Sequence, residues 1–186
     1  MPNFDLYQQM WDNMVINDEK AIEAASKRIL EHKETYQEVV LDTPLSWQFV
    51  GVIHYRESNL DFTTHLHNGD SLKSRTKNVP AGRPFDGKPP FTWQESAKDA
   101  LFTLKKLDTY DNWDLPHILY QLECFNGLGY KKSHSEVNSP YLWSGTNYYE
   151  KGKYASDGKF DSELVDKQIG TVPLFKFLTD KTLGLV

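Results

Sequence analysis

Glu57 is the residue whose position best suits acid or base chemistry. It follows the apolar segment 47–53 and is followed at once by Ser58 and Asn59. A helix over 43–58 would place its carboxyl group at the C-terminal end of a buried helix, where partial burial and the helix dipole both favour the protonated form. A carboxylic acid that keeps its proton near neutral pH can protonate a leaving-group oxygen. A glutamate that only caps a helix end is the other interpretation.

His65 and His67 are a second group with possible chemistry. They lie two residues apart, so both rings would point to the same side of an extended segment. With His54 or Asp70 they would complete a set of zinc ligands. The alternatives are structural roles in a polar hairpin and, for His67, contact with a sugar. We predict no metal site and no cofactor.

Helices must position these groups. Apolar residues near helical spacing predict a helix over 3–41 that breaks near 15–20, with Asn17 or Asp18 as the cap of the second part. Thr43 as N-cap and Pro44 at the first helical position predict the start of the helix over 43–58. Because this helix is apolar on nearly all sides, we expect it to be central and buried.

Helical signals return in the second half of the chain. Thr92 and Glu95 form a capping-box pattern at the start of a helix over 92–107. Asp114 or Leu115 opens the next helix, which Gly127 ends. A glycine-containing aromatic stretch follows over 126–159. A final helix is expected to start near Asp161 and to bend or restart at Pro173.

Residues 61–90 differ from the rest because they are polar and rich in turn signals. Asn68-Gly69 favours a tight turn, so we predict a small β-hairpin followed by a loop rich in proline and glycine. A long segment with so little helix inside a helical domain is typical of a functional loop. The sequence therefore predicts one mainly α (α+β) domain over residues 1–186.

Several short segments resemble motifs of the lytic transglycosylase and goose-type lysozyme superfamily. RESNL, at 56–60, resembles the catalytic Glu-Ser motif at the end of a buried helix. CFNGLGY, at 124–130, is similar to a Tyr-Asn-x-Gly segment, with Phe125 in the place of the tyrosine. SPYLWSGTNYY, at 139–149, is similar to a later Pro-Tyr…Thr-x-x-Tyr segment. THLHNGD, at 64–70, resembles the hairpin of compact lysozyme-family proteins from phages and bacteria.

The resemblance implies a lysozyme-like helical domain with a buried central helix and a small β-hairpin insertion. It implies a muramidase that cleaves the β-1,4 bond between N-acetylmuramic acid and N-acetylglucosamine, with Glu57 as general acid. The hairpin at 61–79 and the loop at 126–149 would form the two walls of the cleft. Asn126 would orient an N-acetyl group or simply end its helix, and the tyrosines would stack on sugars or fill the core. The predicted substrate-binding residues are Ser58, His67, Asn126, Tyr141, Tyr148 and Tyr149.

The identity of a second catalytic carboxylate stays open. An inverting enzyme needs one about 6.5–9.5 Å from the acid, and a retaining enzyme needs one at about 5–5.5 Å. Asp70 is the preferred candidate, and Asp61 and Asp86 are the alternatives. The resemblance also allows Glu57 to act first as acid and then as base. The Gly-Leu-Met-Gln segment usual in the family is replaced by 64–70, and Gly145 stands where the family has glutamate, so hydrolysis and transglycosylation both remain open.

The composition of the chain limits the classes of partner that it could bind. The chain has 186 residues, 39 % of them hydrophobic, and a net charge of −5, which is typical of a globular protein and argues against nucleic-acid binding. The single cysteine, Cys124, excludes an internal disulfide and is expected in the core. The first ten residues do not resemble a signal peptide, and no window is apolar for long enough to insert in a membrane.

We therefore expect a monomer made in the cytoplasm that acts on peptidoglycan glycan strands at the bacterial cell wall or periplasm. A phage endolysin, a secreted toxin and a tail-associated enzyme all fit this pattern. A zinc-dependent amidase or peptidase built on His65 and His67, and a non-catalytic glycan-binding protein with the same fold, are the competing hypotheses.

Overall fold

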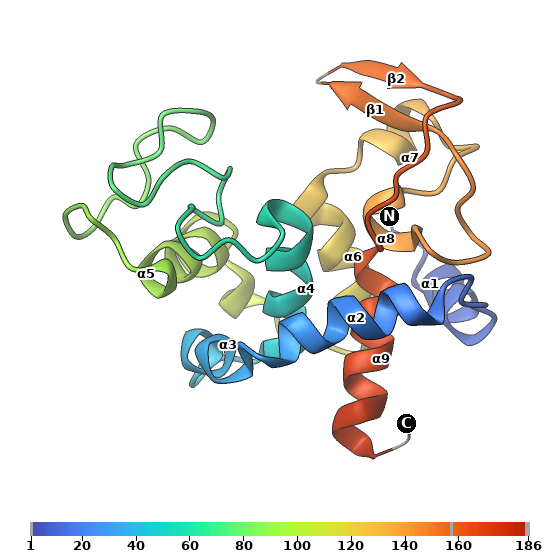
Figure 1. The fold of residues 1–186 in the computed structure, drawn as a ribbon, viewed down its shortest axis with the longest axis horizontal. Coiled ribbons are helices and arrows are strands. Elements are labelled where there is room, and N and C mark those ends of the chain that lie inside the picture. The colour runs from blue at the N-terminus through green and yellow to red at the C-terminus, as the bar shows by residue number, and fades with distance from the viewer. Residues whose placement is uncertain (1, 157, 185–186) are drawn as a thin grey trace. The chain divides into compact units, whose positions relative to one another are not determined.

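The computed structural model describes residues 2–156 and 158–184. Over these residues the chain is mainly helical with one small antiparallel β-hairpin, which confirms the predicted mainly α (α+β) class (Figure 1). The chain forms two compact units, one from Met1–Arg28 with Trp113–Val186 and the other from Ile29–Asn112. The prediction of one domain over 1–186 does not anticipate this division. In the described part of the chain, no helix is both long and apolar enough to cross a membrane.

The unit Ile29–Asn112 is built around a buried helix, as predicted. Every residue of α4 from Trp47 to Tyr55 is buried, and α3 packs against α4 and α5. A helix that is apolar on all sides removes its side chains from water only when other elements cover it on all sides. The helical elements of this unit are α3 (Lys33–Val40), α4 (Trp47–Ser58), α5 (Trp93–Lys98), a π-helical continuation (Asp99–Leu104) and a 3₁₀ turn (Leu107–Thr109).

The start of α4 was predicted wrongly. Its N-cap is Ser46, whose hydroxyl accepts a hydrogen bond from Phe49 N at 3.3 Å. Thr43 is engaged elsewhere, because its hydroxyl donates to the carbonyl oxygen of Val40 at 2.7 Å. Thr43 therefore closes the end of α3, and Pro44 lies in the connection. The capping box at Thr92 is confirmed, since Thr92 and Glu95 each accept a hydrogen bond from the other's backbone N–H.

Gly51 lets α4 pack closely against its neighbours. A Cβ atom at this position would lie 2.6 Å from Cγ2 of Ile29 and 3.3 Å from Cε2 of Tyr36. We expect Gly51→Ala to lower the free energy of unfolding by about 1–3 kcal/mol, since a well-packed core does not accept an extra methyl group. Urea denaturation measures the change. The control is Gly129→Ala, where the nearest atom to the new Cβ is 3.7 Å away; equal destabilisation by both variants would contradict the packing argument.

The segment between α4 and α5 contains no regular strand, so the hairpin predicted at 61–79 is not there. Thr64 and Ser71 form an isolated antiparallel bridge around the Asn68-Gly69 turn. Leu72 N donates to the carbonyl oxygen of Thr63 at 3.1 Å and His65 N to that of Asp70 at 2.6 Å, but these bonds belong to the single bridge, which does not extend into strands. Figure 1 shows this long loop leaving α4 and returning at α5. The turn at Asn68-Gly69 is confirmed, but the strands predicted on both sides of it did not form.

The other unit consists of short helices and the β-hairpin. Asp18 caps α2, as predicted, by accepting from Ala21 N at 3.0 Å. In this unit α6 packs against α1 and α8, and α8 packs against α9. Its elements are α1 (Phe4–Asp12), the start of α2 (Glu19–Leu30), α6 (Leu115–Asn126), α7 (Gly129–Ser133), α8 (Pro140–Trp143), β1 (Lys153–Ser156), β2 (Lys159–Asp161) and α9 (Thr171–Leu183).

Two expectations for this unit are corrected. Strands β1 and β2 lie where an aromatic loop was predicted, with Tyr154 opposite Phe160. The final helix begins at Thr171, so the segment after Asp161 is not helical. Asp161 accepts a hydrogen bond from Glu163 N at 2.9 Å, which is a local turn rather than a helix cap. Asp114 as N-cap of α6 and Gly127 as its C-cap are confirmed.

Candidate functional site

Glu57 occupies the last turn of α4. It is half-buried, and it lies one residue before the end of the helix at Ser58. Asn59 ends the helix in the left-handed conformation, with φ 53° and ψ 37°, and its N–H donates to the carbonyl oxygen of Tyr55 at 3.0 Å. The predicted context of this glutamate, the C-terminal end of a buried helix, is therefore confirmed. Ser58 is half-buried beside it, and its hydroxyl donates to the carbonyl oxygen of His54 at 3.5 Å.

An aromatic cluster supports the same end of α4. The ring of His54 lies 4.4 Å from that of Trp93 and 4.6 Å from that of Phe62, centroid to centroid. His54 Nε2 donates to the carbonyl oxygen of Asp61 at 3.3 Å, because a carbonyl can only accept. Its Nδ1 therefore accepts from the hydroxyl of Tyr36 at 3.1 Å. The cluster ties the chain after Glu57 to α3, α4 and α5.

The cluster predicts a stability that depends on pH. Burial lowers the pKa of His54 from 6.5 to about 4, although the hydrogen bond to the Asp61 carbonyl works in the opposite direction. Between these values the unfolded chain binds a proton that the folded chain does not. The contribution of His54 is thus present above pH 6.5 and is lost as the pH falls towards 4, by up to about 3 kcal/mol.

Urea denaturation at a series of pH values tests this expectation. His54→Gln should remove this part of the pH dependence, whatever its effect on stability at pH 7. Identical pH profiles for the wild type and His54→Gln would refute the assignment.

Asp70 organises the loop after α4. Its carboxylate accepts from Lys77 N at 2.7 Å, from Asn78 N at 2.9 Å and from the side-chain amides of Asn78 and Asn68 at 2.7 and 3.1 Å. The backbone amides of Asn78 and Lys77, in that order, hold the pKa of Asp70 below its usual range. These contacts give Asp70 a structural role. Its predicted role as a second catalytic carboxylate stays a prediction.

A buried polar network holds the later part of this loop, and no pattern in the sequence predicts it. Asp99 is 7 % exposed and accepts from Arg83 Nε at 2.8 Å and Nη2 at 2.7 Å. His67 Nε2 also contacts Asp99, at 2.7 Å, and the His67 side chain has no exposed surface. Burial lowers the pKa of His67, and Asp99 opposes this effect. Because its ring is covered, the predicted contact of His67 with a sugar would require the loop to open.

His65 belongs to the same network. Its Nε2 donates to the carbonyl oxygen of Ser74 at 2.8 Å, and its Nδ1 lies 2.9 Å from the hydroxyl of Ser96. Both ring nitrogens of His65 therefore have hydrogen-bond partners. The same holds for His67, whose Nε2 contacts Asp99 and whose Nδ1 lies 3.3 Å from the hydroxyl of Ser96. Among the described residues, no group of three or more histidine, cysteine, aspartate or glutamate side chains could hold a metal ion.

The other predicted substrate-binding residues belong to the unit that contains α6. Asn126 is exposed at the end of α6, and Tyr141 is buried in α8. Tyr148 is half-buried and packs edge-on against Trp143 at 5.3 Å. The hydroxyl of Tyr149 accepts from Asp166 N at 3.0 Å. The sugar-binding roles of these residues stay predictions, as does the cleft between 61–79 and 126–149.

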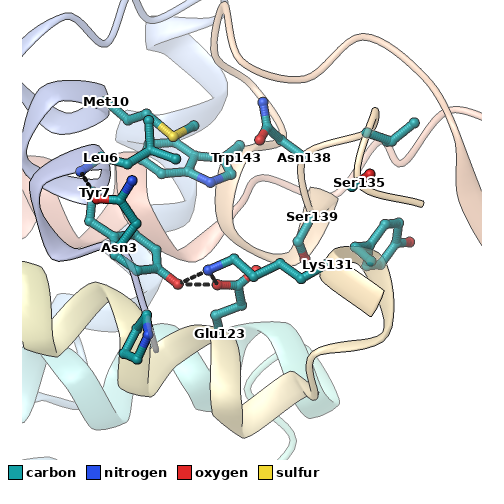
Figure 2. A pocket seen from close by; sticks show the side chains of 13 residues that line it. Asn3, Leu6, Tyr7, Met10, Glu123, Lys131, Ser135, Asn138, Ser139 and Trp143 are labelled. Atoms are coloured by element: carbon teal, nitrogen blue, oxygen red, sulfur yellow. Dashed lines mark hydrogen bonds and ion pairs between the residues drawn. The ribbon is translucent and has the colours of Figure 1, made fainter. Parts of the chain in front are cut away.

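The same unit contains a pocket that was not predicted from the sequence. It has a volume of about 300 Å³ and lies between α1, α6, α7 and the segment 135–143 (Figure 2). At its floor Lys131 Nζ lies 2.6 Å from Glu123 Oε2, and the hydroxyl of Tyr7 contacts both groups. The signal for it in the sequence is Glu123, the single acidic residue of α6.

The remaining carboxylates considered for catalysis have ordinary surroundings. Asp61 is exposed and caps its own turn by accepting from Thr63 N at 2.8 Å and from the Thr63 hydroxyl at 2.7 Å. Asp86 is exposed on the loop before α5. Cys124 is a half-buried cysteine of α6.

Comparison of the chain with family models, with curated proteins and with solved structures gives no match. The resemblance to the lysozyme-like superfamily therefore stays a prediction that rests on the motifs at 56–60, 64–70, 124–130 and 139–149.

Proposed function

We propose that this chain is a peptidoglycan-degrading muramidase in which Glu57 is the general acid. The substrate is the β-1,4 bond between N-acetylmuramic acid and N-acetylglucosamine. The observation that carries the proposal is the half-buried position of Glu57 in the last turn of a buried helix. Partial burial and the negative end of the helix dipole both disfavour an ionised carboxylate there, so the group is suited to deliver a proton to a glycosidic oxygen.

The contacts around the end of α4 support the proposal because they hold the turn after Glu57 in place. Catalytic groups work best when packing and hydrogen bonds fix their supporting residues. The aromatic cluster around His54 holds one side of the turn, and the Asp99–Arg83 pair holds the loop that follows. A long loop that is held by buried polar contacts is consistent with a binding or catalytic surface rather than with a simple connection between helices.

The contacts of Asp70 favour a scheme with a single catalytic glutamate. All the contacts of its carboxylate serve to order the segment 68–78. A general base would have to give up some of these hydrogen bonds in order to bind a water molecule. We therefore infer that Glu57 first protonates the leaving group and then, as the carboxylate, activates the group that attacks the sugar.

The cell-wall glycan is the proposed partner, and the bacterial cell wall or periplasm is the proposed place of action. A phage endolysin and a delivered toxin both fit this activity. The negative net charge of −5 gives no attraction to an anionic wall, so recognition has to come from the site itself.

Treatment with a metal chelator separates this proposal from a zinc-dependent amidase. We expect EDTA to leave the rate of turbidity loss of purified peptidoglycan unchanged, because the proposed acid–base chemistry uses only protein groups. The full contacts of His65 and His67 agree with this expectation. Loss of lysis in EDTA, with recovery on addition of zinc, would favour the amidase instead.

A further inference from the structure

The pocket in the unit that contains α1 and α6 is a built site, and it is separate in its residues from the Glu57 region. Figure 2 shows its lining side chains, which come from α1, α6, α7 and the segment 135–143. A volume of about 300 Å³ is at the small end of the range for small-molecule sites. The pocket therefore suits a single ring with its substituents.

The floor of the pocket is polar but carries no net charge. Glu123, which is 4 % exposed, pairs with Lys131 at 2.6 Å, and the hydroxyl of Tyr7 donates to the same carboxylate. Burial, and then the neighbouring Glu123, raise the pKa of Tyr7 far above its usual range, so its phenol stays protonated. An ionic ligand would have to compete with this ion pair, whose carboxylate is buried although the Lys131 side chain is 45 % exposed. An uncharged ligand leaves the pair intact.

Two groups are available to hold such a ligand. Ser139 is 3 % exposed, and its hydroxyl has no hydrogen-bond partner among the described residues. Burying a hydroxyl without a partner is costly, which indicates that a ligand or water completes it. Lys131 has three ammonium hydrogens, of which Glu123 and Tyr7 take two, so one remains for a carbonyl oxygen.

Apolar and amide groups complete the lining. Leu6, Met10 and Trp143 supply an apolar wall, while Asn3 and Asn138 add side-chain amides. The Asn138 amide nitrogen already donates to the carbonyl oxygen of Tyr148 at 3.0 Å, which leaves its oxygen as an acceptor for a ligand hydroxyl. The combination suits a ligand that carries hydroxyls, an amide carbonyl and a small apolar group.

We propose that this pocket binds an uncharged, amide-bearing sugar ring, and that Ser139 and Lys131 hold its polar groups. N-acetylglucosamine is the probe. All the groups that would hold this ring belong to the pocket, so its binding goes beyond the proposed function and does not depend on Glu57 being catalytic.

The test is a titration of the full chain carrying Glu57→Gln with each sugar. The NMR signal of the Trp143 indole reports binding. We expect N-acetylglucosamine to shift this signal, with glucose, which lacks the amide, and charged glucosamine each binding at least about fivefold more weakly. Ser139→Ala should weaken N-acetylglucosamine binding about fivefold. Leu6→Trp, at a residue that is 47 % exposed at the pocket, should block binding without touching a buried group.

Ser26→Ala is the matched control, because Ser26 also has a buried hydroxyl without a partner among the described residues but does not line the pocket. It should bind N-acetylglucosamine like the parent. No shift at Trp143, equal binding by Ser139→Ala, or equal binding of glucosamine overturns the proposal. Lysis is measured separately on the wild-type chain, so binding without lysis refutes only the Glu57 assignment, and lysis without binding refutes only the pocket.

Discussion

Replacing Glu57 by glutamine is expected to slow the lysis of purified peptidoglycan by about a hundredfold to ten-thousandfold, the usual contribution of a general acid or base. Glutamine has nearly the shape of glutamate but no acidic proton to deliver. Because the two side chains are nearly isosteric and Glu57 is only half-buried, the fold and glycan binding should be retained. Turbidity loss gives the rate, and thermal unfolding checks the fold.

Glu34→Gln is the control for this change. Glu34 is an exposed glutamate in the first turn of α3, in the same unit, and its replacement should leave lysis within about twofold of wild type, since exposed substitutions of this kind have small effects. Wild-type lysis by a folded Glu57→Gln protein would rule out Glu57 as the acid. Loss of lysis with retained binding would also exclude the hypothesis that the chain is only a glycan-binding relative.

Asp99→Asn should cost about 3–5 kcal/mol of unfolding free energy, which is the typical cost of breaking a buried ion pair. The variant leaves the buried Arg83 side chain without its counter-charge, and it removes one of the two oxygens that accept from Arg83 and His67. The amide of asparagine can accept from one of these donors but presents its own N–H groups to the other. Urea denaturation gives the change in free energy.

Asp86→Asn is the comparison for this measurement. Asp86 lies on the same loop but is exposed, so its replacement should change the free energy of unfolding by less than about 0.5 kcal/mol. If Asp99→Asn is as mild as Asp86→Asn, the pair with Arg83 does not hold the loop. The support that we infer for the Glu57 region would then need another source.

Local patterns in the sequence predicted the elements that depend on neighbouring residues. The apolar residues on nearly all sides of 45–53 predicted a buried α4, and the Thr92–Glu95 pattern predicted the start of α5. Gly127 ends α6 as expected, with φ 102°, a conformation that favours glycine. These signals act within one turn of helix, so they can be recognised without knowledge of the fold.

Long-range pairs explain what the sequence could not predict. Arg83 and Asp99 meet across a loop, and Tyr7 meets Glu123, which is 116 residues further along the chain. Neither pair leaves a periodic pattern. The Asn68-Gly69 signal suggested strands on both sides, but Asp70 and the buried histidines stabilise an irregular loop instead. The strands at 153–156 and 159–161 lie in an aromatic stretch, on either side in sequence of Asp157-Gly158, a turn signal comparable to Asn68-Gly69 that was not used in the prediction.

Mass spectrometry of the fragments released from purified peptidoglycan by the wild-type chain tests the central claim most directly. We predict fragments whose new ends are N-acetylmuramic acid, still joined to their stem peptides. A terminal sugar with the full mass indicates hydrolysis, and one lighter by a single water indicates transglycosylation. Free stem peptides with intact glycan strands would show that an amide bond is cut, and would contradict the assignment of Glu57 as a glycosidic acid.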